Sequence, residues 1–430
     1  MKRFVLLSGL VYLLLLGGLA GLHRGLLALA IPLLVYLAVA LISGPIDLRL
    51  RAVRSVNPDR VVEGTPVTMR LSITNEGSTL ERFVARDLIP AGLTVDNGKS
   101  FAAAVLTPGE TLDMEYTLQT KRGCYVLSTV HVAASDLLGL SQRTTLLVPQ
   151  NEGSGQLIVL PHVARLHRLA IRPRRTRGHA GPVPARLGGS GTDFYGVREY
   201  QPGDPRRWIN WRASARHDSG LFTNQFEQER IANVGLILDA RARSDVRAGS
   251  DSLFEHAIQA TASLADAFLQ DGNRVGLLVF GRYVDWTFPG YGKVQRERIL
   301  HALTHAEPGE SEVFNSLGIL PTRLFPAGSQ LVLVSPVTRD DLPVLLRLRA
   351  RGYQLLVIRP NAIDFEMQGP PHNQEMELAA RILRAEWRLV RRRLLQAGVQ
   401  VVDWPVDRLL DQVVHATLGR VPPWFRALGM

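Results

Sequence analysis

Cysteine is almost absent from this chain of 430 residues, which contains only Cys124. A disulfide within the chain and a zinc site built from several cysteines are therefore excluded. Lysine is nearly as scarce: Lys2, Lys99, Lys121 and Lys293 are the only lysines, so arginine carries the formal net charge of +11. A positive excess of this kind fits an anionic membrane surface, a nucleic acid or an acidic protein, and by itself it selects none of them.

The sequence also lacks the patterns of common catalytic sites. It contains no G-x-S-x-G nucleophile elbow and no H-E-x-x-H zinc motif. Residues 188–191 have the glycine-rich composition of a phosphate-binding loop, but no buried strand precedes them and no Lys-Ser/Thr pair follows. We therefore predict that the protein is not an enzyme and binds no cofactor.

The first 48 residues contain two long apolar runs. Residues 4–22 and 26–42 hold no charged side chain, and His23, Arg24 and Gly25 separate them. A helix that crosses the hydrocarbon core needs about 17–25 apolar residues, so each run reaches the minimum. We predict a hairpin of two transmembrane helices within residues 1–48. A cleaved signal peptide followed by one anchor is the alternative, but no A-x-A-like site precedes the second run.

The cations that flank the two runs predict the orientation of the hairpin. They are Lys2 and Arg3 before the first run, Arg24 between the runs, and Arg49, Arg51 and Arg54 after the second. Because cations are enriched on the cytoplasmic side, both ends of the hairpin are expected to face the cytoplasm. Arginines close to the membrane also attract anionic lipid, at about 1 kcal/mol each. We expect a multi-pass protein of the inner (plasma) membrane, with its soluble domains in the cytoplasm.

Residues 51–149 have the pattern of short strands between turns. Residues 66–74 alternate apolar and polar side chains, and pairs such as Asn97-Gly98 and Pro108-Gly109 mark turns at strand-like spacing. No segment of this region has a convincing helical period. The simplest fold is an all-β sandwich of the immunoglobulin-like type, which is expected to act as a spacer or binding module.

Residues 150–231 form an Arg/Gly/Pro-rich connector followed by a polar segment. Residues 172–178 of the connector have the sequence RPRRTRG. A solvated linker is the favoured interpretation, because no aromatic side chains alternate with the arginines to stack on bases. Binding of anionic lipid or nucleic acid through these arginines is the alternative.

Strands alternate with helices from residue 232 onwards. Buried strands are predicted over residues 233–239, 274–280, 330–335, 354–358 and 399–403. Helices are predicted from Ser252 and over residues 294–303, 342–351, 375–396 and 407–418. This alternation predicts a doubly wound α/β domain over residues 232–419, followed by a tail over residues 420–430.

Charged and aromatic residues are densest in residues 188–229. Asp204 followed by Pro205 is a favourable helix start, so we predict a helix from Asp204 to about Arg216, with a strand over residues 221–229. Two interpretations stay open. The arginines and aromatic residues form a recognition surface, or the arginine and glutamate side chains pair with each other and fix the segment to the sheet.

Residues 193–229 follow the pattern D-F-x-G-x-R-E-Y-x-x-G-D-x-x-R-x-I-x-W-x-x-S-A-R and then F-x-x-E, while residues 122–125 are RGCY and residues 136–140 are DLLGL. These motifs resemble those of the domain-of-unknown-function 58 (DUF58) family. The resemblance implies a von Willebrand factor A-like domain after the signature. It also implies a membrane-anchored scaffold that works with a MoxR-type AAA+ ATPase in chaperone-like or assembly processes. The partner-binding candidates are Asp193, Arg198, Glu199, Tyr200, Asp204, Arg207, Trp211, Ser214 and Arg216.

The metal site of such a domain is degenerate in this sequence. Von Willebrand A domains that bind a metal carry D-x-S-x-S after the first strand, whereas here Asp239 is followed by Arg241 and Arg243. Pro336 stands where a further acidic ligand would be expected. Guanidinium groups repel a divalent cation, and one carboxylate supplies too few oxygen ligands. We therefore predict no metal at this site, with Asp239 paired with a nearby arginine.

Overall fold

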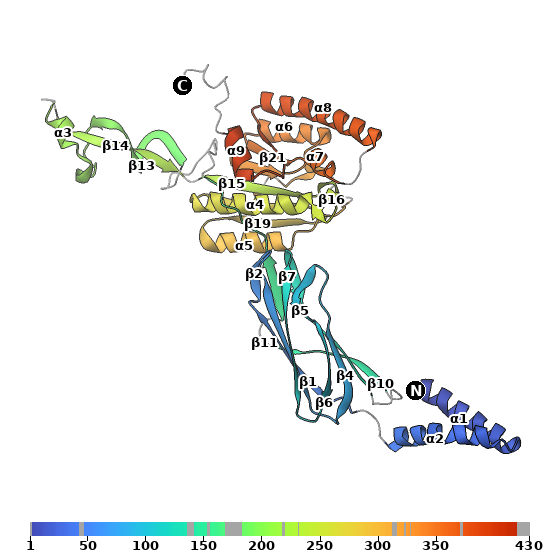
Figure 1. Ribbon diagram of the computed structural model, residues 1–430. Helices are drawn as coiled ribbons and strands as arrows, with labels where there is room; N and C mark the ends of the chain where they lie inside the picture. Colours follow the sequence, from blue (N-terminus) through green and yellow to red (C-terminus); the bar gives the residue numbers. More distant parts are fainter. Residues whose placement is uncertain are drawn as a thin grey trace. The chain divides into compact units, whose positions relative to one another are not determined.

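The computed structural model (Figure 1) describes the chain except for residues 1, 43–46, 136–141, 153–154, 168–182, 217–219, 231, 312–315, 322–323, 327, 370–372 and 419–430. The side chains of residues 2–5, 39–42, 152, 183–193, 195 and 226–230 are also not described. The DLLGL motif, the RPRRTRG run and the tail therefore fall on residues that are not described. The chain divides into two compact units, Met1–Leu160 and Pro161–Met430.

Two helices begin the first unit, namely α1 (Lys2–Ala20) and α2 (Arg24–Ile42). A Cβ atom on Gly18 would lie 2.9 Å from the side chain of Leu27, so glycine at this position lets the two helices approach closely. Within the described residues, no helix combines the length and the apolar character that a membrane crossing requires. The side chains at the start of the first predicted run and at the end of the second are not described. The membrane hairpin therefore stays a prediction.

The rest of the first unit consists of strands. They are β1 (Leu50–Asn57), β2 (Arg60–Val62), β3 (Val67–Asn75), β4 (Leu80–Asp87), β5 (Leu93–Gly98), β6 (Phe101–Leu106), β7 (Thr111–Thr120), β8 (Gly123–Val126), β9 (Val130–Ser135), β10 (Gln142–Leu147), β11 (Gln150–Glu152) and β12 (Gln156–Leu160). They form sheets in the orders β11-β1-β3-β7-β5, β10-β9-β4-β6 and β2-β12-β8. The unit extends to Leu160, beyond the predicted boundary at residue 149, because β11 pairs with β1 and β12 pairs with β2 and β8.

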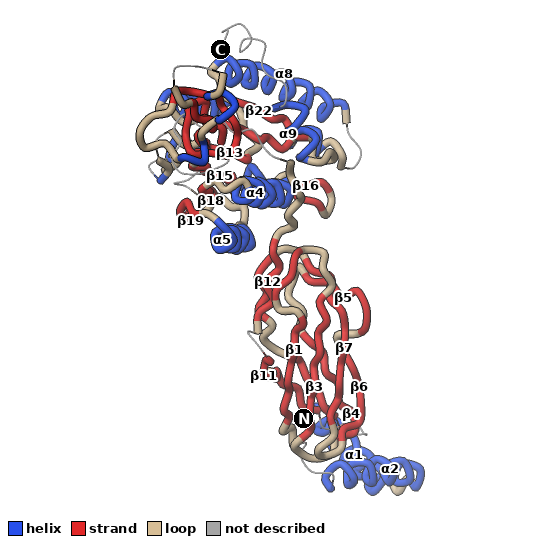
Figure 2. The backbone as a smooth tube through the Cα atoms, turned by 90° about the vertical axis from the view of Figure 1, so that its left-hand side faces the viewer, coloured by secondary structure: helices blue, strands red, loops and turns tan. Residues whose placement is uncertain are grey.

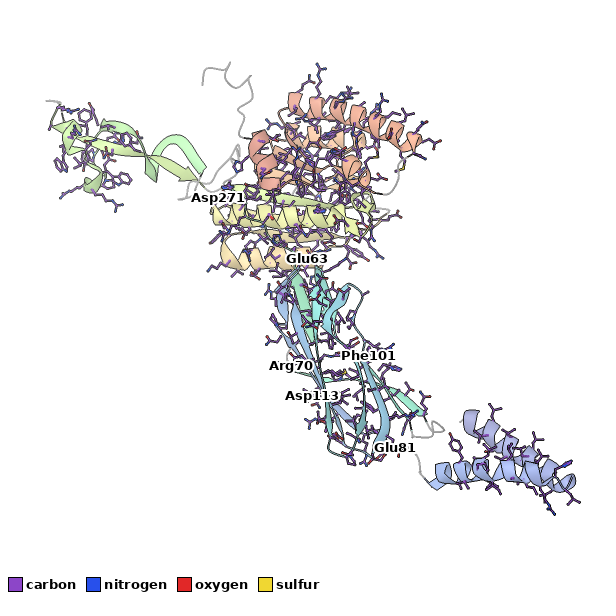
Figure 3. The ribbon with its side chains drawn as sticks, viewed as in Figure 1. Glu63, Arg70, Glu81, Phe101, Asp113 and Asp271 are labelled. Carbon is purple, nitrogen blue, oxygen red and sulfur yellow. The ribbon has the colours of Figure 1, made fainter. Side chains whose placement is uncertain are left out.

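Alternation along the strands builds the core of this unit. In β3, Leu71 and Ile73 are buried and pack with Phe83 of β4 and Val132 of β9, so the two larger sheets share one apolar core. The intervening side chains are half-buried or exposed, and Figure 3 shows that of Arg70 pointing outwards. Figure 2 shows β1, β3 and β7 side by side, in agreement with their pairing. The predicted all-β character is confirmed.

A buried ion pair joins the two sheets and corrects one prediction. Arg54 of β1 forms an ion pair with Asp87 of β4 and donates to the carbonyl oxygen of Leu127 at 2.8 Å. The hydroxyl of Tyr116 donates to Asp87 at 2.7 Å. Burial and then the charge of Asp87 raise the pKa of Tyr116 far above its ordinary value, against the opposing charge of Arg54. Arg54 was expected to be one of the cations near the membrane that attract anionic lipid. The side chains of Arg54 and Asp87 are both buried, so their ion pair stabilises the sandwich instead.

The second unit contains the remaining elements. They are β13 (Val183–Glu199), η1 (Arg206–Trp208), α3 (Trp211–Ser214), β14 (Phe222–Arg230), β15 (Asn233–Ala240), η2 (Ala242–Ser244), β16 (Arg247–Ala248), β17 (Asp251–Ser252), α4 (Leu253–Gln270), β18 (Arg274–Gly281), β19 (Val284–Gly290), α5 (Gly292–Thr304), η3 (Leu317–Ile319), β20 (Gln330–Val334), η5 (Arg339–Asp341), α6 (Leu342–Ala350), β21 (Gln354–Pro360), α7 (Ala362–Glu366), α8 (Gln374–Gln396), β22 (Gln400–Trp404) and α9 (Leu410–Leu418). The last helix begins at Leu410, three residues later than predicted.

Six strands form a mixed sheet in the order β19-β18-β15-β20-β21-β22. All neighbouring pairs are parallel except β18 and the edge strand β19. Every residue of β15 is buried, which explains its continuous apolar sequence. Figure 1 shows α4 and α5 on one face of the sheet and α6 and α8 on the other. The predicted α/β character of this part of the chain is confirmed.

Candidate functional site

The most unusual polar cluster of the second unit lies where β15 and β20 end. The strand order reverses at β15: the next strand in the sequence, β18, lies on one side of it, and the later strand β20 lies on the other. In open α/β sheets, ligands bind at the carboxyl ends of the strands at such a topological switch point. Asp239 lies near the end of β15, Ser335 directly follows β20, and Asp341 ends η5. Strand alternation and the short turn after β20 thus bring two carboxylates and a hydroxyl to one place.

The guanidinium group of Arg241 lies between the two carboxylates. Its Nε donates to Oδ1 of Asp239 at 2.8 Å and its Nη2 donates to Oδ2 of the same residue at 2.6 Å. Its Nη1 donates to Oδ1 of Asp341 at 3.2 Å. The hydroxyl of Ser335 donates to Oδ2 of Asp239 at 2.6 Å, and the backbone N–H of Arg241 donates to its Oδ1 at 3.1 Å. The oxygen atoms of Asp239 are therefore fully occupied by donors.

A second arginine completes the cluster from the outside. Arg243 forms an ion pair with Asp341 and donates to Oγ1 of Thr338 at 3.2 Å. The backbone N–H of Thr338 donates to Asp341 at 3.1 Å, so this carboxylate also closes the capping box of η5. Two aspartates and two arginines thus form a neutral group, which we call the arginine–aspartate cluster: Asp239, Arg241, Arg243 and Asp341.

Burial makes this cluster electrostatically strong. The side chains of Asp239, Arg241 and Asp341 are 0%, 5% and 3% exposed. Burial alone lowers the pKa of Arg241, but the hydrogen bonds and charges of Asp239 and Asp341 outweigh it and raise that pKa above its ordinary value. The guanidinium group is therefore permanently charged and holds the position between the carboxylates that a bound cation would take.

The cluster differs from the sequence-based expectation in one respect. The expected pairing of Asp239 with an arginine is present, but Asp341 was missed, so the site has two carboxylates rather than one. Asp341 is 100 residues from Arg241 in the sequence, and the capping box that begins at Thr338 is the local signal that could have indicated an acidic side chain fixed after β20. Oxygen ligands are therefore sufficient in number, and occupancy by Arg241 becomes the reason to expect no metal.

The signature segment forms a second candidate surface, which we call the signature hairpin: β13, η1, α3 and β14. Strands β13 and β14 are antiparallel, with register shifts near Gly188 and Phe194. The strand β13 was not predicted, because its glycine-rich sequence has no apolar alternation. The predicted helix from Asp204 to Arg216 is wrong, because the chain forms only η1 and the short α3.

Two contacts explain why the helix is interrupted. Asp204 does not cap a helix but accepts from Nη2 of Arg198 at 2.7 Å and from the backbone N–H of Gln201 at 2.9 Å. The Arg198 hydrogen bond, followed by that of Gln201, holds the pKa of Asp204 below its ordinary value. Ile209 is extended and bridges to Thr223 of β14. Long-range pairing therefore overrides the local helix signal.

Side-chain hydrogen bonds brace α3 against β14. Asn210 accepts from the backbone N–H of Ala213 at 2.9 Å and donates to the side chain of Asn224 at 2.8 Å. The hydroxyl of Ser214 donates to the carbonyl oxygen of Asn210 at 2.9 Å and accepts from the N–H of Phe222 at 2.8 Å. Ser214 therefore has a structural role in the hairpin, which the signature pattern alone did not indicate.

The remaining candidates lie mostly on the surface of the signature hairpin. Trp211 of α3 is 68% exposed, and Phe194 of β13 is 61% exposed. Arg207 lies over the ring of Trp208 at 6.0 Å, and the hydroxyl of Tyr200 donates to the carbonyl oxygen of Asp204 at 3.4 Å. Glu199 and Arg216 are exposed, while the side chains of Asp193, Glu227 and Glu229 lie outside the description. The structure thus brings Arg198, Tyr200 and Asp204 together and leaves the side chain of Trp211 exposed.

Residues 196–377 match the family described as "Protein of unknown function DUF58". The chain is also 30% identical over 223 residues to the "Uncharacterized protein YeaD" of Bacillus subtilis (strain 168), a match that covers 51% of this chain and 52% of YeaD. The chain therefore spans about half the length of this relative.

Two solved structures show slight similarity to parts of the chain. A non-cellulosomal cohesin from Archaeoglobus fulgidus has a TM-score of 0.16 and 11% identity, covering 24% of this chain and 86% of the cohesin. An uncharacterized protein from Nocardia farcinica with an immunoglobulin-like fold has a TM-score of 0.15 and 12% identity, covering 25% of this chain and 97% of that protein.

Proposed function

We propose that the protein is a membrane-anchored interaction scaffold that binds a protein partner through the signature hairpin. The observation that carries this proposal is the exposure of Trp211 and Phe194 on a framework braced by Asn210, Ser214 and the Arg198–Asp204 ion pair. Large aromatic side chains on a rigid surface are the residues that contribute most to protein–protein affinity. The DUF58 resemblance supports a MoxR-type AAA+ ATPase as the partner.

The proposal includes a von Willebrand A-like identity for residues 232–419. The sheet order and the single antiparallel edge strand support it, as does the position of Asp239 after the first strand of the sheet. In this proposal the arginine–aspartate cluster replaces the bound cation, because Arg241 occupies the oxygen atoms of Asp239 and Asp341. Partner binding would then proceed without a divalent ion, so chelators should leave it unchanged.

Anionic-lipid or nucleic-acid binding through the arginine-rich connector is the alternative function. Its core residues 172–178 lie outside the described residues, so the argument for it rests on their charge. The salt dependence of binding distinguishes the two proposals. Binding to phosphates weakens steeply between low and physiological salt, whereas binding through Trp211 and Phe194 depends mainly on apolar contact.

Affinity capture from a detergent extract tests the proposed surface. The tagged full-length chain, the Trp211→Ala/Phe194→Ala variant and a Tyr291→Ala control would be compared for recovery of a MoxR-type ATPase. Tyr291 is an exposed aromatic residue outside the hairpin whose side chain makes no cap hydrogen bond to α5. Because loss of one hot-spot aromatic residue costs about 2 kcal/mol or more, recovery by the double variant should fall at least about tenfold. Equal recovery by all three proteins would rule out the signature hairpin as the contact surface.

A further inference from the structure

We propose that His167, Asp411 and His415 form a binding site for a divalent transition metal of the zinc type. Each residue offers one ligand atom, and the three atoms lie within 4.8 Å of one another. Nδ1 of His167 is 2.7 Å from Oδ2 of Asp411, and Nε2 of His415 is 3.5 Å from Oδ1 of the same carboxylate. All three residues belong to the second unit, and the site is separate from the arginine–aspartate cluster.

The chemistry of these ligands fits zinc. Imidazole nitrogen at about 2.0–2.1 Å and carboxylate oxygen at about 2.0–2.2 Å are usual zinc ligands, and two histidines with one carboxylate leave a fourth position for water. Two atoms that bind the same ion lie slightly farther apart than two atoms joined by a hydrogen bond. The exposed ring of His167 therefore has to move only a short way from Asp411 to admit the ion.

Secondary structure already arranges the three ligands. Asp411 and His415 are four residues apart in α9, so they lie on the same face of the helix. His167 is fixed from the other side, because its backbone N–H donates to Asp411 at 2.8 Å. Three residues earlier, the N–H of Ala164 donates to the hydroxyl of Ser263 in α4 at 2.9 Å. A zinc ion would thus fasten the first residues of the second unit to its last described helix.

His167 and Asp411 are 244 residues apart, so no local sequence pattern indicated this site, and no metal was expected.

Calorimetric titration of the full-length protein with Zn²⁺ alone tests the site. The proteins compared would be the chelator-treated wild type, Asp411→Asn, His415→Ala and a His301→Ala/His305→Ala control. His301 in the last turn of α5 and His305 at its C-cap are also four residues apart, with ring centroids 4.6 Å apart, so the control removes an ordinary histidine pair. We expect one saturable Zn²⁺ site per chain in the wild type and in the control. Each site variant should bind more than about tenfold more weakly, since loss of even an outer-shell partner costs that much.

A thermal melt in the presence and absence of Zn²⁺ provides the second measurement. Zn²⁺ should raise the midpoint of thermal unfolding of the wild type and of the control, and should raise that of both site variants by less. His167→Ala, which removes an exposed ring, would replace any site variant that does not fold. No saturable Zn²⁺ binding by the wild type, equal binding by His415→Ala, or loss of binding in the His301/His305 control would each overturn the proposal.

Discussion

Replacing Arg241 by methionine should destabilise the second unit strongly. The substitution keeps an apolar chain of similar length but removes the guanidinium group from between Asp239 and Asp341. Removing one partner of a buried ion pair costs about 3–5 kcal/mol, because the remaining charge is left without compensation. At about 2–4 °C per kcal/mol for a unit of this size, the midpoint of thermal unfolding should fall by about 6–20 °C.

Tryptophan fluorescence is the appropriate assay for this prediction. All six tryptophans follow residue 160, so their emission reports unfolding of the second unit and not of the sandwich. Arg384→Met is the matched control, because Arg384 forms a comparable ion pair with Asp364 in which both side chains are nearly half exposed. An exposed pair contributes about 0–1 kcal/mol, so the control should unfold close to the wild type.

A second substitution separates lost charge compensation from lost packing. Asp239→Asn in the Arg241→Met background removes the carboxylate that is left without a cation, since Arg243 still pairs with Asp341, so it should restore part of the lost stability. If Arg241→Met were no less stable than Arg384→Met, or if Asp239→Asn destabilised the variant further, the reasoning about the arginine–aspartate cluster would be refuted.

Two further predictions concern the other polar groups. Tyr116→Phe should lower the stability of the sandwich at neutral pH by about 1.5–3 kcal/mol, the worth of a hydrogen bond to the charged Asp87. Because the pKa of Tyr116 is raised in the folded state, its contribution to the free energy of unfolding is complete below the ordinary pKa of 10.0 and is lost as the pH rises above that value. Hydrogen exchange in β3 and β7 should therefore show that the difference in stability between variant and wild type narrows above that pH. A gap that widens with pH would contradict this assignment. Ser214→Ala should leave the N–H of Phe222 without its partner at a cost of about 1–3 kcal/mol, and faster hydrogen exchange confined to α3 and the start of β14 should result. Unchanged exchange there would show that Ser214 does not brace the hairpin.

Local sequence patterns predicted the two fold classes because buried positions recur at the regular spacing of strands and helices. The alternation in β3 and the continuous apolar sequence of β15 each depend on residues that are neighbours in the sequence. The position of Asp239 at the end of β15, and its pairing with an arginine two residues on, could be predicted for the same reason.

Long-range contacts account for what the sequence did not reveal. The bridge from Ile209 to Thr223 interrupts the predicted helix, and Asp341 reaches Arg241 from a distant turn. Arg54 was assigned to the membrane side by its position after the second helix, whereas its partner Asp87 lies in another sheet. In each case a partner remote in sequence decides the role of a side chain whose local pattern suggested another one.

The central claim is that the guanidinium group of Arg241 takes the place of a divalent cation between Asp239 and Asp341. Titration of the wild type and of the Arg241→Ser/Arg243→Ser variant with Mg²⁺ and Mn²⁺ tests it directly. The variant keeps both carboxylates and the hydroxyl of Ser335 and gains two further hydroxyls, so it should acquire one saturable site that Asp239→Ala removes, while the wild type should show no site that depends on Asp239. Saturable binding by the wild type that Asp239→Ala abolishes would contradict the claim.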